Sequence, residues 1–264
     1  MKKIVLIALL LTFGGFVGKA QNSFINEYEV NIGYSIFQGD YGVGGDFSST
    51  LGNYGFLVGG KVYFNFLDSD RTLCYPCVHL KFPVSIYAGY SLLNFNNVDF
   101  KTLTPEVIKL KAFKGDIIEA SLNAGVEYHI GDLRNFSFPQ NSVLSKLDPY
   151  VGGSFGVTAY SVNLESDLGD FKSNPHLLPE AYVNRIYDEP GLVANISFEA
   201  GFRYKISENL NITISNKWIY YISDKVDGVV PDPGLVKNEH DDWQFSPSLG
   251  IVFWLQSGKF FAVK

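Results

Sequence analysis

The stretch Ile117–Ile130, IIEASLNAGVEYHI, alternates apolar and polar side chains at nearly every position. One face carries Ile118, Ala120, Leu122, Ala124, Val126 and Tyr128, and the other carries Glu119, Ser121, Asn123, Gly125, Glu127 and His129. A period of two residues is that of a β-strand. Such alternation over about a dozen residues predicts a strand that crosses a membrane as part of a β-barrel.

Seven further segments of similar length repeat this pattern: Glu27–Gln38, Asn53–Asn65, Pro83–Asn94, Tyr150–Val162, Val193–Ile206, Leu210–Ile222 and Asp242–Leu255. Their polar faces consist mostly of Gly, Ser, Asn and Thr, and small residues suit the narrow lumen of a barrel of about eight strands. The apolar face then contacts lipid, and closure leaves no strand edge unpaired. The sequence therefore predicts an all-β fold, an eight-stranded antiparallel up-and-down transmembrane β-barrel.

The aromatic residues separate into two groups if the odd-numbered strands run outward from the periplasm. Near the outer rim are Tyr54, Phe56, Tyr90, Trp218, Tyr220, Trp243 and Phe245. Near the periplasmic rim are Tyr28, Phe64, Phe66, Tyr128, Phe202, Tyr204 and Phe253. Aliphatic residues such as Val58, Leu122 and Ile196 lie between them. Two aromatic girdles around an aliphatic band are typical of an outer-membrane barrel.

The chain opens with two lysines and an uncharged run from Ile4 to Gly18, followed by a small residue, Ala20. This pattern predicts a cleaved signal peptide at residues 1–20 and an outer-membrane β-barrel domain at residues 21–264. Cleavage removes three lysines, so the net charge changes from −6 to −6 − 3 = −9. An acidic chain argues against nucleic acid as a partner. We expect an integral protein of the cell outer membrane.

Eight charged side chains are predicted to point into the lumen: Glu29, Lys61, Glu119, Glu127, Glu199, Arg203, Lys205 and Lys217. Because four acids face four bases, and buried charges persist when paired, we expect a salt-bridge network that plugs the barrel. The alternative is a solute pathway lined by the same residues. A barrel of about eight strands has no open pore, which favours the plug.

Cys74 and Cys77 form a C-x-x-C motif in a compartment that permits disulfides. The motif has three interpretations: a local structural disulfide, an unpaired thiol pair, and a redox or metal site. No helix of a thioredoxin-like unit surrounds it, and a fourth zinc ligand beyond His79 is not evident. The disulfide is the preferred interpretation, and neither a metal nor a cofactor is predicted.

Three other features lie near the barrel mouths. The run Glu239–Asp242 is either a solvated acidic loop or, less plausibly, the carboxylates and His of a protease; His129 fits a polar network better than a catalytic base. The outer loop Asn163–Leu192 contains Pro179–Ile186, which could form a short helix. Its apolar side chains predict a lid over the lumen, with a partner contact as the alternative.

Two periplasmic connections, Leu67–Phe82 and Gly131–Asp148, are longer than the tight turns usual at this rim. Extended loops on the periplasmic side offer surfaces on which another protein can dock. We therefore expect contacts with outer-membrane lipid and lipopolysaccharide and with a periplasmic protein of an envelope or secretion complex.

The sequences Glu29-Val30-Asn31-Ile32-Gly33-Tyr34, Gly39-Asp40-Tyr41 and Tyr63-Phe64-Asn65-Phe66 resemble the small outer-membrane β-barrel proteins of Bacteroidota. Some of these are similar to the barrel component associated with type IX secretion and gliding. The resemblance implies a non-enzymatic scaffold or anchor for an envelope or secretion complex, and no catalytic residues carry over. The alternative is narrow transport or binding of a small or apolar ligand through a loop-gated barrel. An enzyme acting on lipid or peptide ranks third.

Overall fold

A computed structural model describes residues 26–41, 47–64, 79–130, 146–207, 209–230 and 242–255. The predicted signal peptide, Cys74, Cys77 and His240 lie outside the described residues. So do residues 67–78 and 131–145, which make up most of the two long connections predicted on the periplasmic side.

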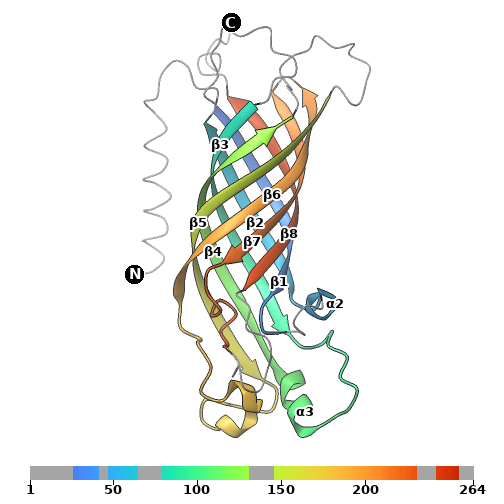
Figure 1. Ribbon diagram of the computed structural model, residues 1–264, viewed down its shortest axis with the longest axis vertical. Coiled ribbons are helices and arrows are strands. Elements are labelled where there is room, and N and C mark those ends of the chain that lie inside the picture. Colours follow the sequence, from blue (N-terminus) through green and yellow to red (C-terminus); the bar gives the residue numbers. More distant parts are fainter. Residues whose placement is uncertain are drawn as a thin grey trace, which may run out of the picture.

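Eight strands form one closed antiparallel barrel, in which each strand pairs with its sequence neighbours and β8 closes on β1 (Figure 1). The strands are β1 (Asn26–Gln38), β2 (Tyr54–Phe64), β3 (His79–Asn94), β4 (Phe113–His129), β5 (Leu147–Ser166), β6 (Gly191–Ser207), β7 (Leu210–Tyr221) and β8 (Trp243–Leu255). The predicted fold class is confirmed. No helix among the described residues is long and apolar enough to cross a membrane.

The two faces of each strand differ in exposure as the alternation predicts. On β4, Ile118 is 59% exposed on the outside, whereas its neighbour Glu119 is 4% exposed inside the barrel. Aromatic rings on the outer face stack across strands, as in the pairs Tyr34–Tyr54 and Phe56–Tyr90, with centroids 6.0 and 5.9 Å apart. A barrel with an apolar exterior and a polar interior is the arrangement that a lipid environment favours.

Strands β4 and β5 extend several residues beyond the predicted limits at one end of the barrel, and there the polarity of their faces inverts. Lys114 and Asn163 point outward, while Phe113, Val162 and Leu164 are buried inside. The sequence prediction ended both strands near this inversion because it followed only the pattern of apolar residues on the outer face. The backbone ladder continues, since hydrogen bonding does not depend on which face is apolar.

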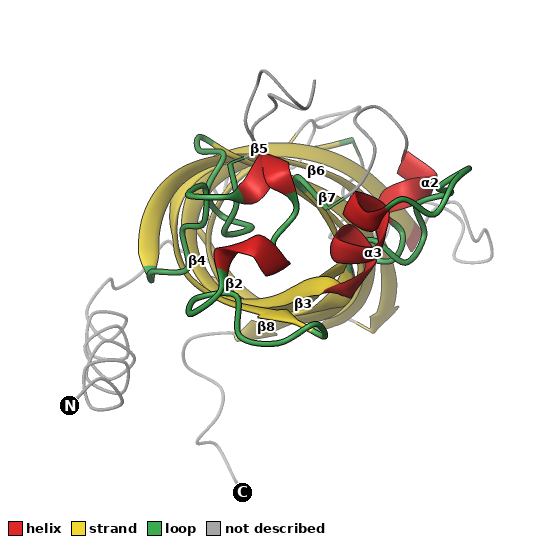
Figure 2. Ribbon diagram, turned by 90° about the horizontal axis from the view of Figure 1, so that it is seen from below, coloured by secondary structure: helices red, strands yellow, loops and turns green. Residues whose placement is uncertain are grey.

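The same end of the barrel is covered by its connecting segments, as the view from this side shows (Figure 2). They include α2 (Phe47–Thr50), α3 (Pro105–Ala112) and the 3-10 turns η2 (Pro175–Leu177) and η3 (Glu180–Tyr182). Helix α3, which was not predicted, begins at Pro105 after Thr104, whose hydroxyl accepts a hydrogen bond of 3.3 Å from the Val107 amide. The short helix predicted at Pro179–Ile186 is reduced to the single turn η3.

We call residues 39–41, 167–190 and 222–230, together with Asp242 before β8, the cap. Tyr182 stacks on Phe113, which also stacks on Tyr41, and both centroid separations are 5.7 Å. The segments are joined by an antiparallel bridge between Ile186 and Val229 and by backbone hydrogen bonds around it. The cap segments and the barrel wall together form an apolar core of Phe37, Leu93, Phe95, Val98, Ile117, Val162, Leu164, Phe171, Leu178, Val193, Ile219, Tyr221, Val226 and Val229. The loop between β5 and β6 therefore packs as a lid.

Replacing Tyr182 by alanine should loosen the cap, because the buried ring contacts two aromatic residues and its hydroxyl donates to the Asp40 carbonyl oxygen. Loss of a buried aromatic side chain costs about 3–5 kcal/mol. Cleavage of residues 222–230 by a protease added to the micelle-bound protein should then accelerate by at least about a hundredfold. Leu103→Ala, at a position 73% exposed, is the control and should leave the rate unchanged. Equal rates in both variants would contradict the assigned packing.

Candidate functional site

The lumen beneath the apolar core is filled by buried ionised and hydroxyl side chains. At the centre is Arg203, which is fully buried and donates to Glu27 over 2.8 Å and to Glu127 over 3.2 Å. The guanidinium carbon also lies 4.4 Å from the centre of the Tyr63 ring. A planar, always charged group that two carboxylates and a ring enclose is strongly fixed in position.

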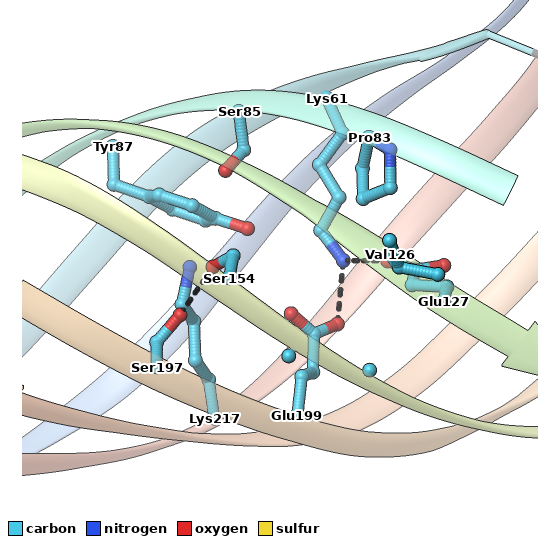
Figure 3. A pocket seen from close by; sticks show the side chains of 12 residues that line it. Lys61, Pro83, Ser85, Tyr87, Val126, Glu127, Ser154, Ser197, Glu199 and Lys217 are labelled. Atoms are coloured by element: carbon cyan, nitrogen blue, oxygen red, sulfur yellow. Dashed lines mark hydrogen bonds and ion pairs between the residues drawn. The ribbon is translucent and has the colours of Figure 1, made fainter.

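Lys61 on β2 forms the second centre, across the lumen from Arg203 on β6 (Figure 3). Its ammonium lies 2.5 Å from Glu199, 3.0 Å from Glu127 and 3.9 Å from Glu29. Glu127 thus contacts both Lys61 and Arg203 and links the two centres. These strands are far apart in sequence, and barrel closure brings their side chains together across the lumen.

Tyrosines inside the barrel complete the hydrogen bonding of the carboxylates. The Tyr63 hydroxyl donates to Glu29 over 2.6 Å, and the Tyr150 hydroxyl donates to Glu199 over 2.8 Å. The Tyr150 ring also packs against Gly201, where a side chain would meet it. The plug is therefore built from aromatic side chains as well as from ion pairs.

His129 stands between two carboxylates toward the end of the barrel opposite the cap. Its Nδ1 lies 2.7 Å from Asp148, and its Nε2 lies 3.1 Å from Glu127. Because both ring nitrogens are occupied and the side chain is fully buried, the imidazole has no free nitrogen to act as a general base. Lys81, which contacts Glu27 over 2.7 Å, lies in the same layer.

Lys217 and Glu199 face each other from paired positions on β7 and β6, yet no ion pair joins them. The Lys217 ammonium lies 3.5 Å from the centre of the Tyr87 ring instead. Next to it is a small cavity, with about 20 Å³ of room for water, lined by Ser85, Ser154 and Ser197 among others (Figure 3). That volume holds about one water molecule, which can bridge the charged groups, and is too small for an organic ligand.

Seven of the eight predicted lumen charges are buried inside the barrel, and Lys205 is half-buried near the end of β6. Five of them meet in the two ion-pair centres, namely Glu29, Lys61, Glu127, Glu199 and Arg203. Glu119 lies apart, nearer the cap, where Tyr221 and Gln244 donate to it.

The sequence analysis missed several members of the network. These are Glu27, Tyr63, Lys81, Tyr150 and Asp148, together with Tyr221 and Gln244. Strand parity places Tyr63 on the same face as Lys61, so the alternation could have identified it. Lys81 and Asp148 lie in parts of β3 and β5 that precede the predicted strand limits.

A second polar cluster lies in the cap itself. Asp40, Asp227 and Asp242 are each at most 3% exposed. The interpretation of Glu239–Asp242 as a solvated acidic loop is therefore wrong for Asp242, which closes onto the cap, while residues 239–241 lie outside the described part of the chain. Among the described residues, no group of three or more His, Cys, Asp and Glu side chains is arranged to hold a metal ion.

No family model and no curated protein matches the chain. Solved structures of low identity are similar in architecture. Neisserial surface protein A is 12% identical over 86% of this chain and 96% of its own, with a TM-score of 0.42. Ail of Yersinia pestis, in complex with the heparin analogue sucrose octasulfate, is 14% identical over 88% and 99%, with a TM-score of 0.39. The outer membrane enzyme PagL is 11% identical over 86% and 98%, with a TM-score of 0.31. Similarity at these sequence identities and TM-scores concerns the fold alone.

Replacing Arg203 by methionine should destabilise the barrel by about 3–5 kcal/mol, because Glu27 and Glu127 would stay buried without their shared cation. The matched control is Lys114→Met, which removes an exposed ion pair to Asp167 at the end of β4 and should change the free energy of unfolding far less. Urea unfolding in detergent micelles measures both. Similar losses in the two variants would contradict a stabilising role of the buried pairs.

Proposed function

We propose that this chain is a non-enzymatic integral β-barrel of the outer membrane that serves as a scaffold or anchor for an envelope or secretion complex. The observation that carries the proposal is that side chains fill the described part of the barrel at two levels along its axis. Ion pairs and tyrosines fill the lumen around Arg203 and Lys61, and an apolar core beneath the cap fills its end. Since ion-paired and apolar side chains occupy the described interior, and the cavity beside Lys217 has room for about one water molecule, we assign the function to the outer surface and the connections.

The outer face supports the membrane placement. Exposed apolar side chains encircle the barrel, among them Ile32, Ile86, Leu122, Ile196, Ile214 and Leu249. Toward the cap, Lys114 and Glu165 replace them on the outside of β4 and β5, as expected where a strand leaves lipid for water. A tight turn joins β6 to β7 at the opposite end, where Ser207 pairs with Leu210, so we assign that end to the periplasm and the cap to the exterior.

Leu122→Arg and Asn163→Arg test this placement, because they introduce the same charge on the outer face at two positions along the barrel axis. Leu122 lies on the aliphatic part of the outer face, so arginine there should cost about 2–4 kcal/mol of folding free energy in lipid vesicles. Asn163 lies in the polar region near the cap, where the cost should be about 0–1 kcal/mol. Equal costs would contradict the assigned membrane boundary.

The inward histidine supports a non-enzymatic role. His129 engages carboxylates through both nitrogens within the plug, and the two carboxylates are themselves held by other partners or by burial. A catalytic dyad needs a base with one nitrogen turned toward a nucleophile or substrate. The proposal therefore assigns Glu127, His129 and Asp148 to the structure of the lumen.

The complex is tested by purification from native outer membranes in mild detergent, with and without cross-linking, followed by identification of the proteins that co-purify. We expect a stoichiometric envelope protein, with the type IX secretion complex as the first candidate from the resemblance of residues 29–66. Shortening the connections at 67–78 or 131–145 should release it. Shortening the segment 95–104 at the capped end is the control and should retain it.

A barrel that purifies without any partner would contradict the anchoring role. Planar-bilayer conductance then separates the remaining functions. We expect no conductance above that of the bare bilayer, because the ion-paired side chains of the lumen and the apolar core at the capped end would both have to move to open a path. Steady conductance, or a small ligand extracted with the purified protein, would instead establish narrow transport or ligand binding.

A further inference from the structure

The cap contains two buried carboxyl groups that form no ion pair within the described part of the chain. Asp227 and Asp242 are both fully buried, and neither side chain lies within ion-pair distance of a described Lys, Arg or His. Buried carboxylates are ordinarily paired with cations or carry a proton. The cap therefore holds an acidic pair whose charge state is open to change.

The two side chains face each other at the foot of the cap. A Cβ added to Gly39 would meet both Asp227 Oδ2 and Asp242 Oδ1, so these two oxygens converge on one point. Only glycine fits at this position. The arrangement resembles the carboxyl pairs in which two close acids cannot both ionise readily.

Backbone amides hold one oxygen of Asp242 and leave the other without a donor. Oδ2 accepts from the amides of Val226 and Asp227 over 2.8 and 3.1 Å, whereas Oδ1 is buried and has no hydrogen-bond partner. A proton on Oδ1 removes the charge and turns an unsatisfied acceptor into a donor directed at Asp227. Oδ1 of Asp242 is thus the atom best placed to carry a proton.

Asp227 connects the segments of the cap that the pair holds together. Its Oδ2 accepts from the amide of Asp40 over 2.6 Å, which ties the segment after β1 to the segment after β7. Its Oδ1 accepts from the Val229 amide over 3.0 Å, next to the bridge that joins Val229 to Ile186. This one carboxyl group therefore contacts two of the three cap segments directly and lies next to the bridge that joins the third.

Among the residues that the structure describes, the titratable groups with the largest effects on the pair or affected by it are acidic or phenolic. They are Asp40 and Tyr41 after β1, Tyr160 on β5, Tyr182 in η3, Tyr221 at the end of β7, and Asp224 after β7. None of these supplies positive charge. Ionisation of the pair would thus add negative charge to an already acidic, water-poor region.

We propose that Asp227 and Asp242 form a proton-sensitive latch, which holds the cap closed while the pair retains a proton and lets it open when both carboxyls ionise. The segments released would be those that meet at the pair, residues 39–41 and 222–230 together with the strand-like contact at Ile186. The barrel beneath, with its own backbone ladder, stays closed in both states.

The direction of the pH dependence follows from the two states. Burial raises the pKa of Asp227 to about 7 in the closed cap. Burial, with Asp227 and Asp40 close by, raises the pKa of Asp242 well above its ordinary value. In an open cap both groups meet water and return to a pKa of about 3.9. The closed cap therefore binds more protons, so closure is most favourable below about pH 4 and weakens as pH rises through about 7.

Amide hydrogen exchange of the whole protein in lipid nanodiscs measures the latch. Protection factors, corrected for the intrinsic pH dependence of exchange, are followed at Val226, Asp227, Tyr187 and Val229, whose amides hydrogen-bond within the cap. Between about pH 5 and pH 7, protection should fall by about tenfold per pH unit for each proton that the closed cap retains and the open cap loses, while amides of β4 stay unchanged. Protection that is independent of pH at these amides would overturn the proposal.

Two variants and a matched control separate the latch from general instability. Asp242→Asn keeps the oxygen that accepts from the Val226 and Asp227 amides and removes one titrating group. Asp227→Asn also removes one titrating group but keeps only one of its two acceptor oxygens. Each variant should make the pH profile of cap protection shallower. Asp99→Asn changes an exposed acid at the same end of the barrel and should keep the original profile. If an asparagine variant does not form a barrel, the pH profile of the unchanged protein still decides.

The same measurement at about pH 8 with calcium or with EDTA distinguishes a proton from a metal ion. Protection that is unaffected by either addition supports the proton latch. Protection that calcium restores and EDTA removes would overturn it in favour of a divalent cation between the two carboxylates.

Discussion

Closure of the backbone ladder is the constraint on which the rest of the molecule depends. Because β8 pairs with β1, every strand has two hydrogen-bonded neighbours and the sheet has no edge. An eight-stranded closed sheet encloses a space only as wide as the side chains that point into it. Everything polar on the inner face must therefore find its partner inside, and everything on the outer face must suit the medium around the barrel.

The charges in the lumen are best understood through this enclosure. Arg203, Lys61 and Glu127 come from strands that are distant in sequence, and the ring of strands turns them toward a common axis. Pairing does not make such an interior more stable than an apolar one would be, but once charges are enclosed the loss of one partner is costly. The tyrosines fill space and supply donors at the same time, which small residues cannot do.

The sequence was sufficient to predict the architecture. The period of two residues and the difference in polarity between the two faces of a strand are both local properties of the sequence. It was insufficient where a strand continued after the polarity of its faces inverted, as at Phe113 and Leu164, since no local rule says that an apolar residue has moved from the outer to the inner face. It predicted eight charges in the lumen, of which seven are buried there, but could not say which would meet. Lys217 is paired in register with Glu199 and yet lies over the ring of Tyr87, a contact between β7 and β3 that the order of strands does not predict.

The inversion on β4 and β5 also explains why the barrel has two kinds of interior. Under the proposed placement, the part of the wall in lipid must be apolar outside, which leaves its polar residues to the lumen. Beyond the lipid, water favours a polar outside, so the same strands can turn Val162 and Leu164 inward and build an ordinary apolar core. Asp227 and Asp242 lie in the apolar interior, where a charge has neither the cations of the lumen nor the water of the surface. They lie between the lumen, where carboxylates are paired with cations, and the surface, where water solvates them. We therefore expect the protonation of this pair, rather than that of the paired carboxylates in the lumen, to respond to pH.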